Sequence, residues 1–150
     1  MKVCVGGTFN RLHKGHKLIL SKAFEYAGTA GTVFIGLATG DLVKNKENIE
    51  HLNTRRTKLN KYLLKEGINN QAVIVPITNK YGLTLEEDFD AIVISPETER
   101  IATEINRKRI SKGKKPLTIV KIPFVLAKDG KPISSTRINR KEIDENGNLL

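Results

Sequence analysis

The 150-residue chain has no tryptophan, one methionine and a single cysteine, Cys4. One cysteine cannot form an internal disulfide, so the sequence favours a reducing compartment, and we expect a cytoplasmic protein. No apolar run approaches the ~20 residues that a membrane-spanning helix needs, and the N-terminus lacks a signal-peptide pattern. Because Cys4 lies inside the apolar run Val3–Val5, we predict that it is a small core residue and not a nucleophile.

Aromatic residues are also scarce, at 5% of the chain, although the formal net charge is +10. Proteins that bind single-stranded nucleic acid combine basic grooves with aromatic side chains on which bases stack. Here the basic residues are spread along the whole chain, and no recognised nucleic-acid motif occurs. We therefore interpret the excess charge as a pocket for small polyanions within a lysine-rich solvated surface. A basic nucleic-acid-binding module stays as the alternative.

Apolar residues make up 39% and charged residues 28% of the chain, which is ordinary for a folded protein and argues against disorder. At this length, 1–150 is predicted to form a single domain around one core. The last ten residues, 141–150, are mostly polar, and we expect them to fray. The sequence predicts no particular oligomeric state.

Apolar runs and amphipathic stretches alternate along the chain. The runs predict strands at 3–6, 32–38, 71–77, 91–94 and 117–122. The amphipathic stretches predict helices at 14–26, 51–66 and 97–111, and a short last helix that begins in the Ser134–Thr136 cluster. Strands joined through helices form right-handed crossovers and a parallel sheet. The expected fold is α/β, with a single Rossmann-like, doubly wound parallel sheet of five strands and flanking helices.

Helical spacing assigns an inner and an outer face to two of these helices. The predicted inner residues are Leu52, Leu59, Tyr62, Leu63 and Leu64 in the helix at 51–66, and Ile101, Ile105 and Ile110 in the helix at 97–111. The predicted outer residues include the arginines Arg55, Arg56, Arg100, Arg107 and Arg109.

The stretch from Gly6 to His16, GGTFNRLHKGH, joins the first strand to the first helix. Its histidines, His13 and His16, are three residues apart, so both imidazoles lie on one helix face. A helix N-terminus offers free backbone N–H groups and a positive dipole end, and glycines let a phosphate approach the backbone. With the Thr8 hydroxyl, the stretch predicts a polyphosphate site. Two alternatives stay open: a metal pair, which lacks a cysteine or carboxylate at ligand spacing, and a structural pair, one packed and one capping.

Three further polar clusters follow predicted strands or open the last helix, at 44–46, 95–98 and 134–140. The carboxyl ends of parallel strands meet at one edge of a sheet, so these clusters are expected to face the same crevice as the histidines. No serine, cysteine or carboxylate is paired with a base as a covalent nucleophile would be. The pattern favours direct phosphoryl or nucleotidyl transfer by positioning and charge stabilisation.

The histidine stretch closely resembles the Gly-Gly-Thr-Phe-Asp-x-Leu-His-x-Gly-His signature of the nucleotidyltransferase superfamily, with Asn10 where Asp is usual. The Ile-Ser-Ser-Thr element that begins at Ile133 is also similar to a late motif of that superfamily. Together the two resemblances indicate an adenylyl- or cytidylyltransferase.

Three middle segments narrow the resemblance: 42–46 (LVKNK), 81–84 (YGLT) and the polar positions of 95–109. They resemble the archaeal phosphopantetheine adenylyltransferases, which are similar to the adenylyltransferase domain of eukaryotic CoA synthase. Leu83 stands where the related domains often have proline. The same scaffold is used by glycerol-3-phosphate cytidylyltransferases, FAD synthetases and NMN adenylyltransferases, which remain the alternatives within the superfamily.

The resemblance implies that ATP and 4′-phosphopantetheine react to give dephospho-CoA and pyrophosphate, in CoA biosynthesis. It implies Mg²⁺ held by ATP and water, with no ligand from a protein side chain. His13 and His16 would contact the ATP phosphates, with His16 as the main catalytic group. Lys44 or Lys46 would hold the substrate phosphate and stabilise the transition state, and the sequence leaves open which one does so.

The other implied site residues fall into two groups. The implied nucleotide or phosphate contacts are Gly6, Gly7, Thr8, Phe9, Ser134, Ser135, Thr136 and Arg137. The implied substrate contacts are Thr8, Ser95, Glu97, Thr98, and Arg100 or Arg107.

Overall fold

The computed structural model describes residues 1–150 and contains one parallel five-stranded sheet with the order β3-β2-β1-β4-β5. The strands are β1 (Lys2–Gly7), β2 (Thr32–Ala38), β3 (Ala72–Ile77), β4 (Ala91–Ile94) and β5 (Thr118–Lys121). The chain adds β2 and β3 on one side of β1 and then returns to add β4 and β5 on the other. This confirms the predicted doubly wound sheet, whose winding reverses between β1 and β4.

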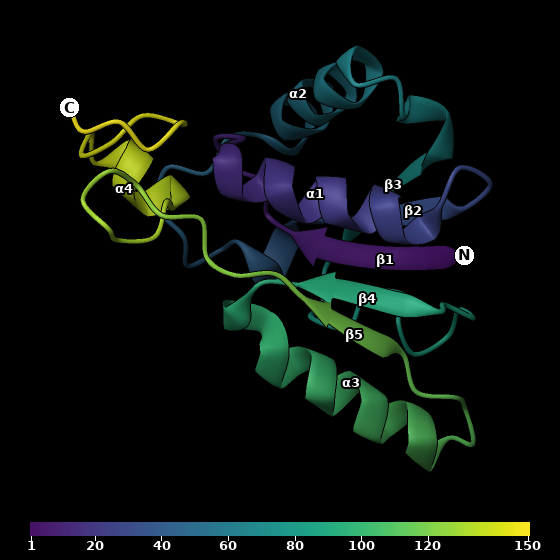
Figure 1. Ribbon diagram of the computed structural model, residues 1–150. Coiled ribbons are helices and arrows are strands. Elements are labelled where there is room, and N and C mark those ends of the chain that lie inside the picture. The colour runs from purple at the N-terminus through teal and green to yellow at the C-terminus, as the bar shows by residue number, and fades with distance from the viewer.

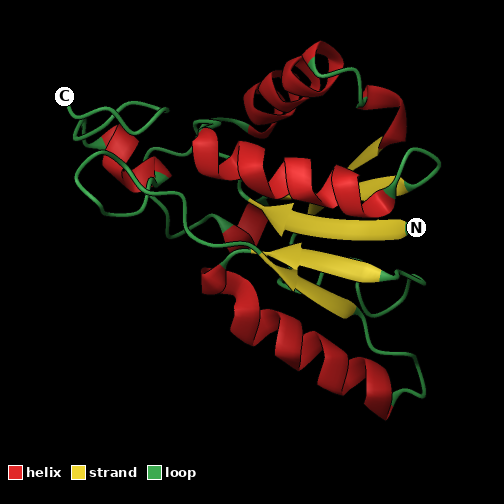
Figure 2. Cartoon of the chain, in the orientation of Figure 1, coloured by secondary structure: helices red, strands yellow, loops and turns green.

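Helices lie on both faces of the sheet because right-handed crossovers that run in opposite directions place their helices on opposite sides. The helices are α1 (Lys14–Ala27), α2 (Leu52–Lys65), α3 (Glu99–Ser111) and α4 (Ser135–Asn139). Helices α1 and α2 cover one face and α3 covers the other, while α4 and the C-terminus lie beyond the arrowheads of β1 and β4 (Figures 1 and 2). None of these helices combines the length and the hydropathy that a membrane-spanning segment requires.

The two faces of β1 supply both apolar layers because successive strand side chains point to opposite sides. Val3 and Val5 pack in the cluster under α1 and α2, whereas Cys4 belongs to the cluster that contains Ala102 and Ile105 of α3. Burial raises the pKa of the Cys4 thiol to about 12, so the thiol stays protonated near neutral pH. The structure confirms that Cys4 is a core residue.

The predicted elements agree with the observed ones to within two residues at each end. The largest shift is at the start of α3, predicted at Glu97 and observed at Glu99. Residues Pro96–Thr98 form a separate 3₁₀ turn before the helix. The proline is compatible with such a first turn, since it lacks the N–H that a helix interior needs.

The predicted inner and outer faces of α2 and α3 are wrong for one arginine and one apolar residue in each helix. Arg55 and Arg109 are each only 2% exposed, whereas Leu64 and Ile110, predicted to point inward, are 66% and 59% exposed. Arg55 shares the inward row of α2 with Leu59 and Leu63, four and eight residues later, and Arg109 occupies the corresponding row of α3. Each guanidinium donates to three backbone carbonyls, which satisfies its charge and hydrogen bonds inside the protein.

The crossover from β3 to β4, residues 78–90, contains turns and no helix. The face of β2 and β3 opposite α1 therefore lacks a helix of its own. A mostly apolar cavity of about 230 Å³ lies there, between the sheet, α3 and the turns around Tyr81. We refer to it below as the apolar cavity.

The last ten residues do not fray, contrary to the prediction from their polarity. Ile143 is fully buried and packs with Ala127 and Ile133 in a small third cluster. The backbone of the tail is also held: Lys128 N–H donates to the Gly147 carbonyl at 2.9 Å, and Lys14 N–H donates to the Glu145 carbonyl at 3.0 Å. One apolar residue and a few backbone bonds therefore fold a segment whose composition alone predicts disorder.

Replacing Ile143 by alanine is expected to lower the free energy of unfolding by about 2–3 kcal/mol, because the change leaves a cavity in a small cluster. The measurement is the midpoint of urea unfolding. Leu150→Ala is the control, since Leu150 is 75% exposed and its loss should change stability by less than about 0.5 kcal/mol. Equal midpoints for both variants would show that the tail does not pack as described.

Candidate active site

A cleft of about 750 Å³ opens where the sheet reverses its winding, at the carboxyl ends of β1 and β4. Ligands of open α/β sheets bind at this position. Of the residues predicted for the site, the cleft is lined by Gly6, Gly7, Thr8, Phe9, His13, His16, Lys46, Ser95, Glu97, Thr98, Ser134, Ser135 and Thr136. Segments far apart in the sequence thus meet at one place, as their positions after the strands predicted.

The two histidines cap the first turn of α1 for each other. His13 is the N-cap, and its Nδ1 accepts hydrogen bonds from the N–H groups of Gly15 at 3.1 Å and His16 at 3.4 Å. In return, His16 Nδ1 accepts from His13 N–H at 3.1 Å. The rings stack with their centroids 3.7 Å apart. A side chain at Gly15 would collide with this arrangement, since a Cβ there would lie 2.9 Å from Cε1 of His13.

This capping corrects the predicted source of phosphate contacts. The N–H groups of Gly15 and His16 are bonded to His13, and that of Lys14 to Glu145, so the first turn of α1 has no free backbone donors for a ligand. Both Nδ1 atoms act as acceptors, which places the proton of each neutral ring on Nε2. The structural and ligand-binding interpretations of the pair are therefore compatible: Nδ1 caps the helix, and Nε2–H is left to face the cleft.

Burial lowers the pKa of His13 to about 4. Burial, together with the neighbouring charge of His13, lowers the pKa of His16 to about 3. Both rings are therefore neutral at pH 7 without a ligand, and they offer hydrogen-bond donors instead of cations. The positive end of the α1 dipole also favours the neutral form.

Stability should fall as pH is lowered from 7 to 5. The unfolded histidines bind protons below their ordinary pKa of about 6.5, whereas the folded ones remain neutral down to about pH 4 and pH 3. Their contribution is full above pH 6.5 and declines below it, by up to about 1.4 kcal/mol per pH unit for each histidine. Urea midpoints measured at several pH values test this slope.

The double variant His13→Asn, His16→Asn should show a much shallower slope between pH 7 and 5. The variant His51→Asn, at the exposed residue that precedes α2, should keep the full slope. An unchanged slope in the double variant would contradict the assignment.

The structure separates the two candidate lysines. Lys46 Nζ donates to Thr8 Oγ1 at 2.7 Å and lies on the wall of the cleft. Lys44 points elsewhere: its Nζ lies 3.9 Å from Asp41 Oδ1, its side chain is 63% exposed, and it does not line the cleft. Sequence alone could not distinguish them, because both lysines lie outside any predicted helix or strand, and no periodicity indicates which side chain faces the cleft.

The late Ser/Thr element lies against the histidine segment. Ser134 Oγ caps α4 by accepting from Arg137 N–H at 3.2 Å, and Ser135 Oγ donates to the Asn10 carbonyl. The Ser135 proton is thus already donated, whereas Ser134 Oγ acts as an acceptor and keeps its proton for another partner. Thr136, which is exposed, also lines the cleft.

Three predicted arginines lie outside the cleft. Arg137 is held by ion pairs to Asp129 and Glu142, and its hydrogen bonds to Asp129 hold the pKa of that carboxyl below its ordinary value. Arg100 and Arg107 are exposed on α3 and line neither the cleft nor the apolar cavity. Arg140, from the same late element, does line the cleft and is the better placed cation.

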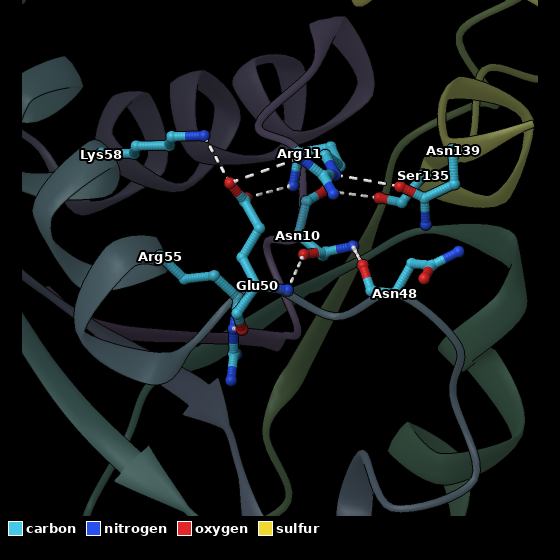
Figure 3. Close-up of polar contacts among 8 residues, drawn as sticks. All are labelled: Asn10, Arg11, Asn48, Glu50, Arg55, Lys58, Ser135 and Asn139. Atoms are coloured by element: carbon cyan, nitrogen blue, oxygen red, sulfur yellow. Dashed lines mark hydrogen bonds and ion pairs between the residues drawn. The ribbon is translucent and has the colours of Figure 1, made fainter. Parts of the chain in front are cut away.

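Several residues at the site could not be found from sequence patterns. Phe124, 41% exposed, lines the cleft from the loop after β5. Arg55 is buried and donates to the Thr8 carbonyl, and Asn10, which in the sequence is only a departure from the signature, is buried as well. Figure 3 shows both residues with Glu50. For Arg55, the one available signal was its spacing of four residues from Leu59, which places it in the buried row of α2.

The apolar cavity and the cleft adjoin each other. They share Gly6, Gly7, Thr8, Lys46 and Thr98, so the hydrogen bond between Lys46 and Thr8 lies where the two meet. One compartment is polar and the other is mostly apolar. No group of three or more His, Cys, Asp or Glu side chains is placed to hold a metal ion.

A family model described as cytidylyltransferase-like matches residues 4–141 of the chain. The chain is 46% identical to the phosphopantetheine adenylyltransferase of Methanosarcina mazei, over 99% of its own length and 96% of that protein. It is 40% identical to the phosphopantetheine adenylyltransferase of Archaeoglobus fulgidus, over 100% of both chains.

Solved structures show the same architecture. A protein of unknown function from Archaeoglobus fulgidus superposes with a TM-score of 0.74 at 36% identity, over 81% of this chain and 89% of that one. A tyrosyl-tRNA synthetase from Archaeoglobus fulgidus, with a TM-score of 0.63 at 14% identity over 91% of this chain and 59% of that one, shares the fold alone.

Proposed function

The chain belongs to the cytidylyltransferase-like family and, within it, to the archaeal phosphopantetheine adenylyltransferases, and from this membership we propose how its site works. The proposed reaction transfers the adenylyl group of ATP to 4′-phosphopantetheine, giving dephospho-CoA and pyrophosphate. The observation that carries the assignment is the pair of adjoining compartments that meet at Thr8 and Lys46.

The two compartments match the two substrates in chemistry. The cleft offers neutral imidazole donors and cations, which suit the triphosphate of ATP. The apolar cavity suits the pantetheine arm, which is long and carries no charge. In this arrangement the phosphate end of phosphopantetheine lies at the junction, next to Lys46, and faces the α-phosphorus of ATP.

The reaction then needs no covalent intermediate on the protein. A phosphate oxygen of phosphopantetheine attacks the α-phosphorus, the bond from that phosphorus to the bridging oxygen breaks, and pyrophosphate leaves with the bond's electrons. Lys46 holds the attacking phosphate and stabilises the charge that develops on the transferred group, while Nε2–H of His13 and of His16 donates to phosphate oxygens. Catalysis is then positioning and charge stabilisation.

Mg²⁺ enters with ATP in this proposal. The protein provides no cluster of ligands for the ion, so phosphate oxygens and water are its expected ligands. When bound, the ion supplies positive charge to the triphosphate. The adenine ring is proposed to lie against Phe124, an aromatic ring exposed on the cleft wall. We place the enzyme in the cytoplasm, in keeping with its single, unpaired cysteine.

The test is an assay of pyrophosphate release with ATP, Mg²⁺ and 4′-phosphopantetheine, with dephospho-CoA identified by mass. Parallel reactions contain glycerol-3-phosphate with CTP, FMN with ATP, and NMN with ATP. The expected result is turnover with ATP and phosphopantetheine and with none of the other pairs. Turnover only with another pair would contradict the proposed substrate. No turnover with any pair, together with salt-sensitive nucleic-acid binding in gel shifts, would favour the binding module instead.

A further inference from the structure

We propose that Arg55 is a positioning residue that holds the Lys46 segment and Thr8 in register, a role that rests on the proposed function. Arg55 lies under the site and is 2% exposed. Nη1 donates to the carbonyls of Thr8 at 3.0 Å and Ala38 at 2.6 Å, and Nε donates to the carbonyl of Glu50 at 2.8 Å. One side chain thus joins three parts of the chain: the loop after β1 that carries Thr8, the end of β2 and the segment that carries Lys46.

A second link comes from Asn10, which is 1% exposed. Its Oδ1 accepts from Glu50 N–H at 2.8 Å, and its Nδ2 donates to the Asn48 carbonyl at 3.4 Å (Figure 3). The Glu50 carboxylate in turn accepts from Arg11 N–H at 3.0 Å and pairs with Lys58. The amide and the carbonyl of Glu50 are therefore both held, one by each link.

Lys46 depends on these links because its own segment has few others. Lys46 N–H donates to the Val43 carbonyl within the same turn, and its side chain meets Thr8. Residues 45–49 form no helix or strand, and Asn48 adopts a left-handed backbone with φ 53°. The contact of 2.7 Å between Lys46 and Thr8 is therefore set from both sides by one guanidinium, through the Thr8 carbonyl and the Glu50 carbonyl.

Arginine suits this role and lysine does not. A guanidinium presents donors on a rigid planar fork, so it can reach carbonyls on several segments at once. An ammonium at the end of a lysine is a compact group and could not span the same three carbonyls. Arg55→Lys therefore keeps the charge while it breaks the link.

The chain contains a matched control. Arg109 is also 2% exposed and also donates to three carbonyls, those of Thr84, Glu87 and Lys115. None of these three residues lines the cleft, and only Thr84 lines the apolar cavity, so Arg109 does not hold the segments that carry Thr8 and Lys46. Arg55→Lys and Arg109→Lys should lower the thermal midpoint to a similar extent. At saturating substrates, Arg55→Lys should lower kcat at least about tenfold, because a displacement of about 1 Å in a site can cost 10²-fold. Arg109→Lys should leave kcat close to that of the wild type.

Hydrogen exchange provides a readout that does not depend on the reaction. Amides 45–50 should exchange faster in Arg55→Lys than in the wild type, and their exchange rates should be unchanged in Arg109→Lys. In Arg55→Lys, KM for ATP should also change less than kcat. Equal exchange at 45–50 in all three proteins, or equal loss of kcat in both variants, would overturn the proposal. If the wild type does not turn over phosphopantetheine, the proposed function fails, while the exchange comparison still decides whether Arg55 holds the segment.

Discussion

Replacing Lys46 by alanine is expected to lower kcat by about 10²–10³-fold, the loss typical when one donor to a developing charge is removed. Lys46 lies where the cleft and the apolar cavity adjoin, with its ammonium on Thr8 Oγ1, and this is where the attacking phosphate is proposed to lie, facing the α-phosphorus of ATP. Because its interaction strengthens as charge develops in the transition state, KM for ATP should change much less than kcat. Initial rates with each substrate varied in turn give both constants.

Lys44→Ala is the matched control, two residues away in the same segment. Its side chain is 63% exposed and pairs only loosely with Asp41, so its loss should alter kcat by less than about twofold. The assignment of Lys46 is wrong if the two variants lose activity equally, or if Lys44→Ala loses more.

The second large effect is expected from His16→Asn, which should reduce kcat about 10²-fold or more. Asparagine can place its Oδ1 near the position of Nδ1 and so keep the hydrogen bond from His13 N–H that caps α1. It cannot reach the position of Nε2, so the donor to the phosphates is lost. The variant should therefore unfold at nearly the wild-type urea concentration while its turnover collapses.

His16→Gln gives the opposite combination. Its longer side chain can carry an amide N–H to the position of Nε2, but it loses the cap at Nδ1. We expect it to be less stable than His16→Asn by about 1 kcal/mol and yet more active. If the asparagine variant keeps its turnover, His16 acts only as a cap and the phosphates are bound by other groups.

The fold could be predicted from the sequence because its signal is local and repeated. Each buried strand is a short apolar run, and Gly28 follows α1 with φ 80°, a conformation that glycine adopts easily. The segment 78–90 has no such periodic signal, and in keeping with this it forms turns and no helix. Polarity mispredicts the tail because its packing depends on one residue, Ile143, which joins a small cluster with Ala127 and Ile133.

The candidate site was predictable where residue type and strand position agree, as for His13, His16 and Ser95. It was not predictable for side chains that can bind either a ligand in the cleft or another side chain of the protein. Arg137 has the expected position in the late element, but Asp129 and Glu142 hold its guanidinium away from the cleft. The sequence predicts Arg55 and Arg109 on the surface because charge usually indicates exposure, and only the tertiary fold brings carbonyls within their reach.

The two buried arginines have a consequence for how such a chain can diverge. Their guanidinium groups bond to main-chain oxygens, which every amino acid carries, and to no side chain of the loops that they hold. The residues of those loops can therefore be exchanged during evolution without loss of these bonds, provided that the backbone path is kept. A scaffold tied in this way leaves side chains around its cleft free to vary, so that new acceptor substrates can arise on an unchanged frame.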